Sequence, residues 1–493
     1  MRKAPWLPLL VAVMGMVLFA PRSLVSFGHT ASYDEGNTVV AAWRVLEGDR
    51  LYADVWQMHA PGTAWALALA FQLLGTTLFT ERLVKLALVG VTVLLLFRLG
   101  RRVASSSLAG GAALLFVMLP PANPFLRPND PAFAATLLAA EVLLGRGYGS
   151  GSRVLTVGLC LGMAAAFRLD FGFYACLAAA VFLVLHGQLR RLALLAAGAA
   201  IVVTGVASVL VLQGVADEAW EQMVRFPATH YAEHRGLPFV EPLAVLVPLG
   251  VALAGVAAAL RRAADVSDRA ALLLVALLCL AYLGYARARP DPEHTLAARA
   301  LAAVAAVGLA NLVARSLDGR RARACVALAL GALVAAAGPG LADTLRAAAS
   351  LGATAPSTLP RVGPLLRPAP ALLEGARLVA ERGPEGQAIF VGNERHDRVL
   401  VNDVLTYFLA DRPSVTRYYN LHPGLATTES VQREIAATLL REPAPLVLLW
   451  RAPLWNEPNA SARPGSELLD RAIRERRRQA DTAGRYSMWV PVE

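Results

Sequence analysis

Residues 154–212 read VLTVGLCLGMAAAFRLDFGFYACLAAAVFLVLHGQLRRLALLAAGAAIVVTGVASVLVL, and this stretch decides the fold class. It contains three apolar runs, at 154–167, 171–187 and 192–212, which are separated only by short charged segments. An apolar helix of about 20 residues crosses the roughly 30 Å of hydrocarbon in a bilayer. The stretch therefore predicts consecutive membrane-spanning helices joined by tight turns.

Similar runs extend from the N-terminus to about residue 340. Of the 493 residues, 56% are hydrophobic and 17% are charged, a composition that is too apolar for a soluble protein of this length. The run that follows Arg2 and Lys3 has no small-x-small cleavage site, so we interpret it as an uncleaved first span. Hydropathy predicts about eleven spans, at 6–26, 83–98, 104–120, 131–146, 154–167, 171–187, 192–212, 242–260, 270–286, 296–313 and 324–340.

Arginines cluster in every second loop, for example at 98–102, 190–191 and 315–323. Positive residues are retained on the cytoplasmic side, so this pattern predicts a cytoplasmic N-terminus and an extracytoplasmic C-terminal region. We expect a bacterial-type inner (plasma) membrane. The same pattern explains the net charge of +11 without a nucleic-acid partner. All four cysteines lie in or beside apolar runs, so neither disulfides nor a thiolate metal site is expected.

The first outer loop, residues 27–82, is unusually long for a loop this close to lipid. Within it, 37–46 has the apolar periodicity of a helix lying in the membrane interface, with Arg44 and Glu47 turned to water. A second interfacial helix is predicted at 65–78. A loop built in this way indicates a functional role on the outer face.

The order of motifs in this loop resembles the GT-C superfamily of glycosyltransferases, in the branch that holds protein O-mannosyltransferases and the lipid A aminoarabinose transferase. The motifs are Asp34-Glu35-Gly36, the G-x-x-x-Y-x-D of Gly48, Tyr52 and Asp54, His59-x-Pro61 where relatives often have Lys-x-Pro, and Gly75 with Arg82. Their succession after a first span is more specific than any one of them.

The resemblance implies roles for several of these residues. An acid of the pair acts as the catalytic base in that superfamily, which implies this role for Asp34 with Glu35 in support. His59 would stand at the carrier-binding group, and its charge at neutral pH is left open because His replaces Lys. Tyr52 and Asp54 would belong to the substrate loop.

Cationic residues at outer span ends are candidates to bind the phosphate of a lipid carrier. They are Arg127, Arg168, Arg287 and Arg289, together with His294. Arg168 and Asp170 interrupt nearly continuous apolar sequence, which requires either a polar cavity or a simple hairpin turn. The segment with Arg289, Asp291 and His294 resembles an outer-loop pattern near the carrier site of relatives, and an ordinary polar turn remains the alternative.

Metal use is left open by the sequence. Asp130 is a candidate second outer acid that orients a metal or the acceptor, by resemblance to some relatives. Asp34, Asp54, Asp130 and His59 offer hard or borderline ligands, but their spacing is not diagnostic. No cofactor is certain, and a divalent metal ion stays an alternative.

A soluble domain is predicted after the spans. Residues 341–370 are rich in Ala, Pro and Gly and read as a linker, and 371–493 reads as a small extracytoplasmic α/β domain. We predict strands at 388–391, 446–449 and 486–490, and helices at 371–382, 402–410, 428–441 and 466–479. Its polar and aromatic loops, at 393–397, 411–413, 417–420 and 422–424, fit either carbohydrate or peptide recognition or a capping role.

The sequence thus predicts an all-α multispan domain over residues 1–340, followed by the α/β domain. The function predicted is inverting transfer of a mannose-type sugar or a pentose from a polyprenyl-phosphate carrier to a glycan, lipid or protein acceptor outside the membrane. The phosphate is already a good leaving group, so one carboxylate base and a group of cations suffice. The alternative is a transporter or flippase of lipid-linked saccharides, which would place charges near the bilayer midplane.

Overall fold

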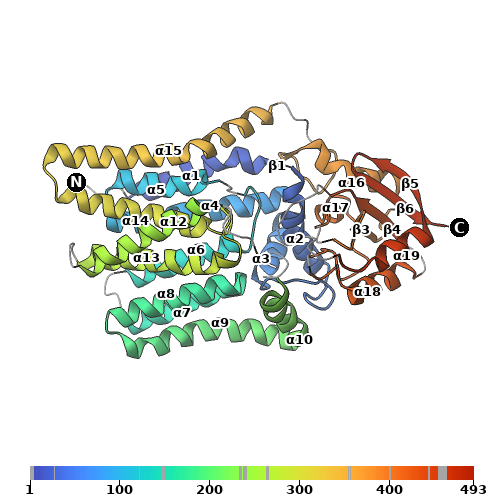
Figure 1. Cartoon of the computed structure of the whole chain (residues 1–493), viewed down its shortest axis with the longest axis horizontal. Coiled ribbons are helices and arrows are strands. Elements are labelled where there is room, and N and C mark those ends of the chain that lie inside the picture. The colour runs from blue at the N-terminus through green and yellow to red at the C-terminus, as the bar shows by residue number, and fades with distance from the viewer. Residues whose placement is uncertain are drawn as a thin grey trace.

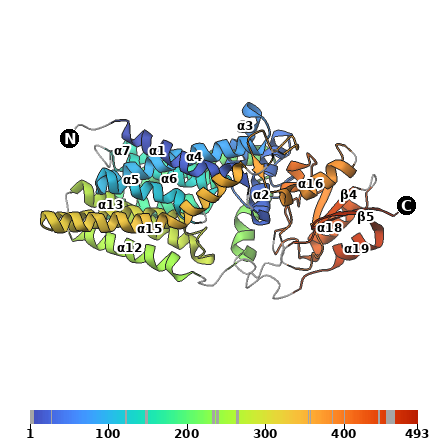
Figure 2. The same ribbon diagram turned by 90° about the horizontal axis from the view of Figure 1, so that it is seen from above.

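The structure of the chain is a computed structural model. The structure describes residues 5–492, except 27, 121–122, 146–149, 232–235, 237–240, 262–265, 353–354, 356, 384, 399–400, 423, 442–444 and 453–463. Long helices run side by side and form a bundle, and the C-terminal domain lies at one end of it (Figure 1). The N-terminus lies at the opposite end of the bundle, and a view turned by 90° shows the same arrangement (Figure 2).

Each of the eleven predicted spans coincides with a helix. These helices are α1 (Leu7–Leu24), α4 (Leu78–Val103), α5 (Ser106–Met118), α6 (Asn129–Leu143), α7 (Gly151–Phe167), α8 (Leu169–Leu185), α9 (Leu192–Leu212), α12 (Pro242–Leu260), α13 (Val266–Tyr285), α14 (Leu296–Arg315) and α15 (Gly319–Leu351). Within the described part of the chain, seven helices are long and apolar enough to cross a membrane. The chain is therefore a multi-pass membrane protein, as its composition predicts.

The last helix of the bundle is longer than expected. α15 continues to Leu351, so the first residues of the predicted linker 341–370 are helical. Farther along, Arg367–Pro368 forms the short strand β2, which pairs in parallel with β1 (Val25–Ser26) at the end of the first span. The backbone N–H groups of Leu78 and Phe79 also donate to the carbonyl oxygens of Arg361 and Val362. The connecting segment is thereby attached to the start of α4.

The first outer loop contains α2 (Gly28–Leu46) and α3 (Gly62–Leu74). α3 exposes Leu69, Leu73 and Leu74, as expected for a helix at a membrane interface. For α2 the interfacial prediction was wrong, because the C-terminal domain covers this helix. Arg44, expected in water, is buried and donates to the carbonyl oxygen of Asp54 and to Asp49.

The C-terminal domain contains a four-stranded sheet in the order β3-β4-β6-β5. β3 (Ile389–Asn393) and β4 (Leu446–Trp450) are parallel, while β6 (Tyr486–Pro491) pairs antiparallel with both β4 and β5 (Arg477–Ala483). The helices are α16 (Pro370–Arg382), α17 (Leu405–Leu409), α18 (Glu429–Leu439) and α19 (Leu468–Arg476). The predicted α/β class is confirmed, but β5 was expected to be the end of a helix. Its residues are polar and mostly exposed, so the edge strand lacks an apolar pattern.

α2 lies between the bundle and the C-terminal domain (Figure 1). On one side it packs against α3, and on the other against α17, where the rings of Trp43 and Phe408 meet edge to face. Gly36 permits this close approach. A Cβ atom at this position would lie 2.5 Å from the backbone nitrogen of Leu405.

The substitution Gly36→Ala should therefore separate α2 from α17 and lower the free energy of unfolding by about 1–3 kcal/mol. The measurement is thermal unfolding of the purified protein in detergent. Gly250→Ala in α12 is the matched control, since a Cβ atom there would meet nothing within 4 Å. Equal melting temperatures for the two variants would contradict the role of Gly36.

Candidate active site

The acidic pair of the first outer loop lies on α2, and its two members face different surroundings. Consecutive residues of an α-helix point about 100° apart. Glu35 is fully buried, whereas Asp34 is half-buried and lines a cavity. The two acids therefore cannot share one role.

Glu35 forms a buried ion pair with Arg82 of α4, in which Nη2 lies 2.5 Å from Oε1. Glu81 Oε2 lies 3.2 Å from Nε of the same arginine. All three side chains are at most 1% exposed. A buried charge is tolerated only with such partners, so this network fixes α2 against α4. Glu35 supports the site through this contact and does not reach the cavity.

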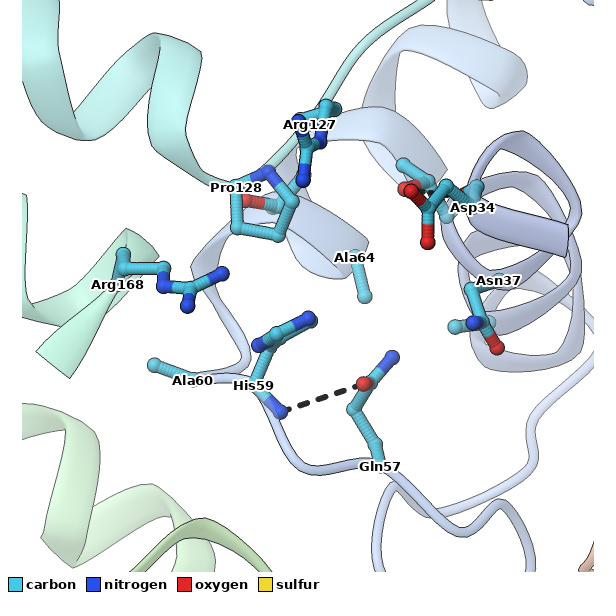
Figure 3. Close-up of a pocket in the computed structure, with 12 residues that line it drawn as sticks. Asp34, Asn37, Gln57, His59, Ala60, Ala64, Arg127, Pro128 and Arg168 are labelled. Carbon is cyan, nitrogen blue, oxygen red and sulfur yellow. Dashed lines mark hydrogen bonds between the residues drawn. The ribbon is translucent and has the colours of Figure 1, made fainter. Parts of the chain in front are cut away.

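Asp34 lines a cavity with residues from several distant segments, which we call the Asp34 cavity (Figure 3). Among the residues that the structure describes, the Asp34 carboxylate has no hydrogen-bond or ion-pair partner. It is therefore available to accept a proton. The described lining residues are Tyr33, Asp34, Asn37, Thr38, Ala41, Trp56, Gln57, Met58, His59, Ala60, Thr63, Ala64, Arg127, Pro128, Arg168, Arg289, Glu293, His294, Asn420 and His422.

Three of the four candidate arginines line this cavity. Arg127 and Arg168 point into it, as Figure 3 shows, and Arg289 also lines it. Each has a carboxylate partner: Glu293 for Arg127, Asp170 at 3.0 Å for Arg168, and Asp291 at 3.5 Å for Arg289.

Arg287 does not join them. It is exposed and lines none of the described cavities, so the structure gives no support for its predicted role at the carrier. Arg287 and Arg289 are only two residues apart, but the helical turn Ala286–Ala288 that ends α13 leaves Arg287 exposed, while Arg289 lines the Asp34 cavity.

His59 lies in the loop before α3, at the centre of the site in Figure 3. Its backbone N–H donates to Gln57 Oε1 at 3.3 Å. Burial, together with the positive charges of Arg168 and Arg127, holds the pKa of His59 well below its ordinary value of 6.5. This shift favours the neutral form of the His59 imidazole. It can donate or accept a hydrogen bond but does not add to the positive charge.

His294 and Asp291 form a half-buried pair beside the cavity. His294 Nδ1 lies 2.8 Å from Asp291 Oδ1. Burial lowers the pKa of His294, although its carboxylate partner opposes the shift. For Asp291, burial alone would raise the pKa, but the hydrogen bond from His294 and the charge of Arg289 lower it. The segment is thus more than a polar turn, because Arg289 and His294 both line the Asp34 cavity.

Two candidates of the substrate loop have structural contacts instead. Tyr52 is fully buried with a φ of 75°, and its hydroxyl donates to the carbonyl oxygen of His59 at 2.9 Å. Asp54 lies outside the cavity, and a hydrogen bond from Arg50 lowers its pKa. Tyr52 therefore positions the His59 loop, and Asp54 has no contact with the site in the described structure.

Asp130 lines a neighbouring cavity rather than the Asp34 cavity. Its carboxylate lies 2.7 Å from Nζ of Lys85 and accepts the backbone N–H of Arg127 at 2.8 Å. The lining residues of this cavity include Lys85, Arg127, Asp130, Glu293, His294 and the rings of Phe116, Phe133 and Phe171. Because Arg127, Glu293 and His294 line both cavities, the two adjoin.

A wider cavity of about 520 Å³ opens on the other side of Arg168. It shares His59 and Arg168 with the Asp34 cavity, and Asp170 also lines it. The remaining lining is mostly apolar and includes Phe173, Met223, Val224 and Pro227. Arg168 is the single residue between α7 and α8, so it lies in the turn between these two helices, and both Arg168 and Asp170 line this cavity.

Other polar groups in the Asp34 cavity were hardly predictable from the sequence. Asn37 and Gln57 belong to the first outer loop, and Asn420 and His422 come from the C-terminal domain. The aromatic and polar character of 417–424 was the only signal for the latter two. Within the described residues, no group of three or more His, Cys, Asp or Glu side chains is arranged to hold a metal ion.

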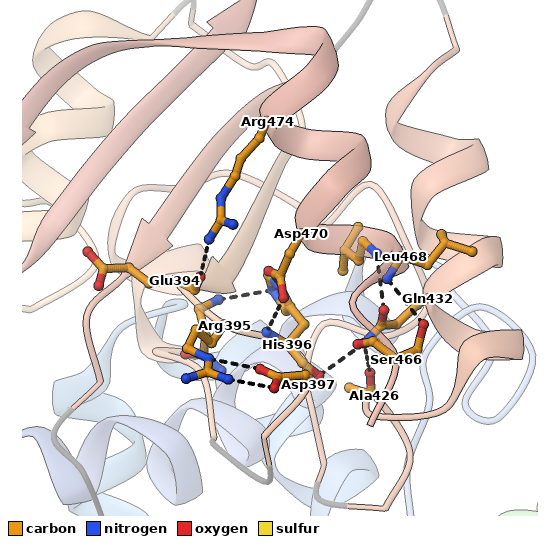
Figure 4. Close-up of polar contacts among 12 residues, drawn as sticks. Glu394, Arg395, His396, Asp397, Ala426, Gln432, Ser466, Leu468, Asp470 and Arg474 are labelled. Carbon is orange, nitrogen blue, oxygen red and sulfur yellow. Dashed lines mark hydrogen bonds and ion pairs between the residues drawn. The ribbon is translucent and has the colours of Figure 1, made fainter. Parts of the chain in front are cut away.

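The loops of the C-terminal domain divide into two kinds. The loop after β3 is held by internal contacts: His396 Nδ1 lies 2.8 Å from Asp470 Oδ1, and Gln432 donates to the carbonyl oxygen of His396 (Figure 4). This loop stabilises the domain. Residues 420 and 422, in contrast, line the Asp34 cavity.

Comparison with known proteins agrees with this architecture. Residues 58–212 match the model of the family described as dolichyl-phosphate-mannose-protein mannosyltransferase. The fold is similar to that of ArnT from Cupriavidus metallidurans bound to undecaprenyl phosphate, with a TM-score of 0.62 and 14% identity over 99% of this chain and 98% of that one. No curated protein sequence matches the chain.

A second similar structure is the archaeal oligosaccharyltransferase AglB from Archaeoglobus fulgidus, in complex with an inhibitory peptide and a dolichol-phosphate. The TM-score is 0.52 at 14% identity, and the match covers 91% of this chain and 70% of AglB. The family match and the shared fold confirm the predicted resemblance to the GT-C glycosyltransferases.

The depressed pKa of His59 predicts a pH dependence of stability. Below about pH 6.5 the unfolded chain binds a proton at this residue that the folded protein excludes, so stability should fall as the pH decreases. His59→Gln should reduce that slope by up to about 1.4 kcal/mol per pH unit. Melting temperatures between about pH 5 and pH 7 measure it. An unchanged slope would mean that His59 binds its proton normally.

Proposed function

We propose that the protein transfers a sugar from a polyprenyl-phosphate carrier to an acceptor at the end of the bundle that carries the C-terminal domain. The observation that carries this proposal is the Asp34 carboxylate, which has no partner among the described residues and shares one cavity with Arg127, Arg168 and Arg289. The similarity to ArnT bound to undecaprenyl phosphate and to AglB with a dolichol-phosphate supports a donor of this class. A mannose-type sugar or a pentose is proposed.

The chemistry follows from the charges. The acceptor hydroxyl attacks the anomeric carbon from the face opposite the phosphate, and Asp34 takes the hydroxyl proton. The bond between the anomeric carbon and the phosphate oxygen breaks, and the electron pair leaves with the polyprenyl phosphate. Guanidinium groups stabilise this anion, and the product has inverted anomeric configuration.

Each part of the chain has a place in this proposal. Residues 1–340 form the membrane domain with the catalytic loop 27–82, residues 341–370 connect the parts, and 371–493 form the extracytoplasmic domain. The N-terminus and the C-terminal domain lie at opposite ends of the bundle, which fits a cytoplasmic N-terminus in an inner membrane (Figure 1). A transporter is disfavoured because the candidate charges gather at one end of the spans.

The replacement Asp34→Asn should lower the transfer rate by about 100-fold to 10,000-fold, because it removes the base while keeping the shape of the side chain. The assay incubates the purified protein with radiolabelled polyprenyl-phosphate sugars and follows the label as it leaves the lipid.

Asp54→Asn makes the same chemical change outside the cavity and should retain the wild-type rate. Both variants should insert into the membrane like the wild type, because neither carboxylate belongs to the buried network of Arg82. Transfer at the wild-type rate by Asp34→Asn would remove Asp34 from the role of base.

A further inference from the structure

One wall of the Asp34 cavity is lined by side chains that form hydrogen bonds, and three of the four are amides. Asn37, Gln57, Asn420 and His422 make up this wall, which we call the amide wall. Asn37 lies across the cavity from Arg168 in Figure 3. Gln57 is 7% exposed and Asn420 only 2%. Buried amides are costly without partners, so such a wall indicates a polar ligand without charge.

The hydrogen bonds within the wall leave specific atoms available. Asn420 Nδ2 donates to Asn37 Oδ1 at 2.8 Å, and Gln57 Oε1 accepts the backbone N–H of His59. Among the described residues, Asn420 Oδ1 is buried without a partner. The amide N–H groups of Asn37 and Gln57 and the carbonyl oxygen of Asn420 therefore remain for a ligand. A sugar hydroxyl both donates and accepts hydrogen bonds, so it fits this mixture.

The part of the wall from the C-terminal domain is held in a defined position. The Tyr419 hydroxyl donates to the carbonyl oxygen of Asn37 at 3.2 Å, which joins the loop to α2. The ring of His422 lies 5.7 Å from that of Trp56 and 5.4 Å from that of Phe226. A site whose groups are already fixed loses little entropy when it binds. The C-terminal domain thus completes the cavity rather than only covering it.

We infer that the amide wall binds the hydroxyl groups of the donor's sugar, and that this sugar is uncharged; the inference rests on the proposed function. An amino group on the sugar would require a carboxylate close by, but Glu293 and Asp170 are paired with Arg127 and Arg168. Asp34, the other acid among the described residues that line the Asp34 cavity, is assigned to the acceptor proton. The arginines of the cavity, Arg127, Arg168 and Arg289, are assigned to the phosphate, so the amides of Asn37, Gln57 and Asn420 offer no charge to a carboxylate on the sugar.

The test measures binding of four carriers to the full-length protein in detergent: polyprenyl phosphate alone, and the same lipid with a neutral hexose, an amino hexose or a hexuronic acid. The wild type should bind the neutral-sugar lipid most tightly. Asn420→Ala should weaken this binding by about tenfold, because one hydrogen bond to the sugar is lost. Binding of polyprenyl phosphate alone should not change. Asn420→Asp should shift the preference toward the amino sugar.

The control is Gln479→Ala, which removes an exposed amide of β5 and should change none of these affinities. Thermal unfolding shows whether each variant is folded. If Asn420→Ala does not fold, Gln57→Ala takes its place in the same comparison. A wild-type preference for a charged sugar would overturn the inference. The inference would also be overturned if Asn420→Ala weakened the binding of polyprenyl phosphate alone and of the neutral-sugar lipid equally.

The outcome for the proposed function is separate. Selective binding of the neutral-sugar lipid without transfer to any acceptor would leave the amide wall intact as a sugar site and would refute the transferase. If the protein transfers a charged sugar and this transfer depends on Asp34, the result would support the transferase and refute the inference that the sugar is uncharged.

Discussion

The ion pair between Glu35 and Arg82 is the interaction on which the site depends. Both side chains are almost completely buried, and Glu81 shares the same guanidinium. Charges removed from water require partners, so this network allows essentially one orientation of α2 relative to α4. With Glu35 fixed toward α4, the helical rotation of about 100° per residue turns Asp34 into the cavity. Gly36 then lets the C-terminal domain approach α2 closely.

Glu81 and Asp130 also position the cationic side of the cavity. Glu81 accepts the backbone N–H of Leu126, and Asp130 accepts that of Arg127, so the segment before α6 is fixed to α4. The arginines of the Asp34 cavity form ion pairs with carboxylates: Arg127 with Glu293, Arg168 with Asp170, and Arg289 with Asp291. A planar guanidinium with five N–H donors can keep such a partner and still bind a phosphate oxygen. Positive charge can therefore stay at the membrane boundary without a ligand.

Much of the fold followed from the sequence because lipid imposes simple rules. Spans such as 192–212 and 242–260 coincide with helices to the residue, since a long apolar run in a membrane can only be helical. The buried strands Ile389–Asn393 and Leu446–Trp450 were also recognisable as apolar runs. Errors arose where tertiary contacts override local pattern. α2 has an amphipathic sequence but is covered by the C-terminal domain, and β5 is a polar edge strand.

For the site, the sequence by itself determined which chemical groups are present: an acidic pair after the first span and arginines at the outer ends of later spans. It could not decide which acid faces the cavity, why Arg289 lines it while Arg287 does not, or that Asn420 and His422 join it from more than 350 residues away. Those outcomes depend on helix rotation and on the docking of distant segments. The order of motifs in the sequence predicts neither the helix rotation nor the docking. Both are determined by the pairing of buried charges and by close packing between segments that are distant in the sequence.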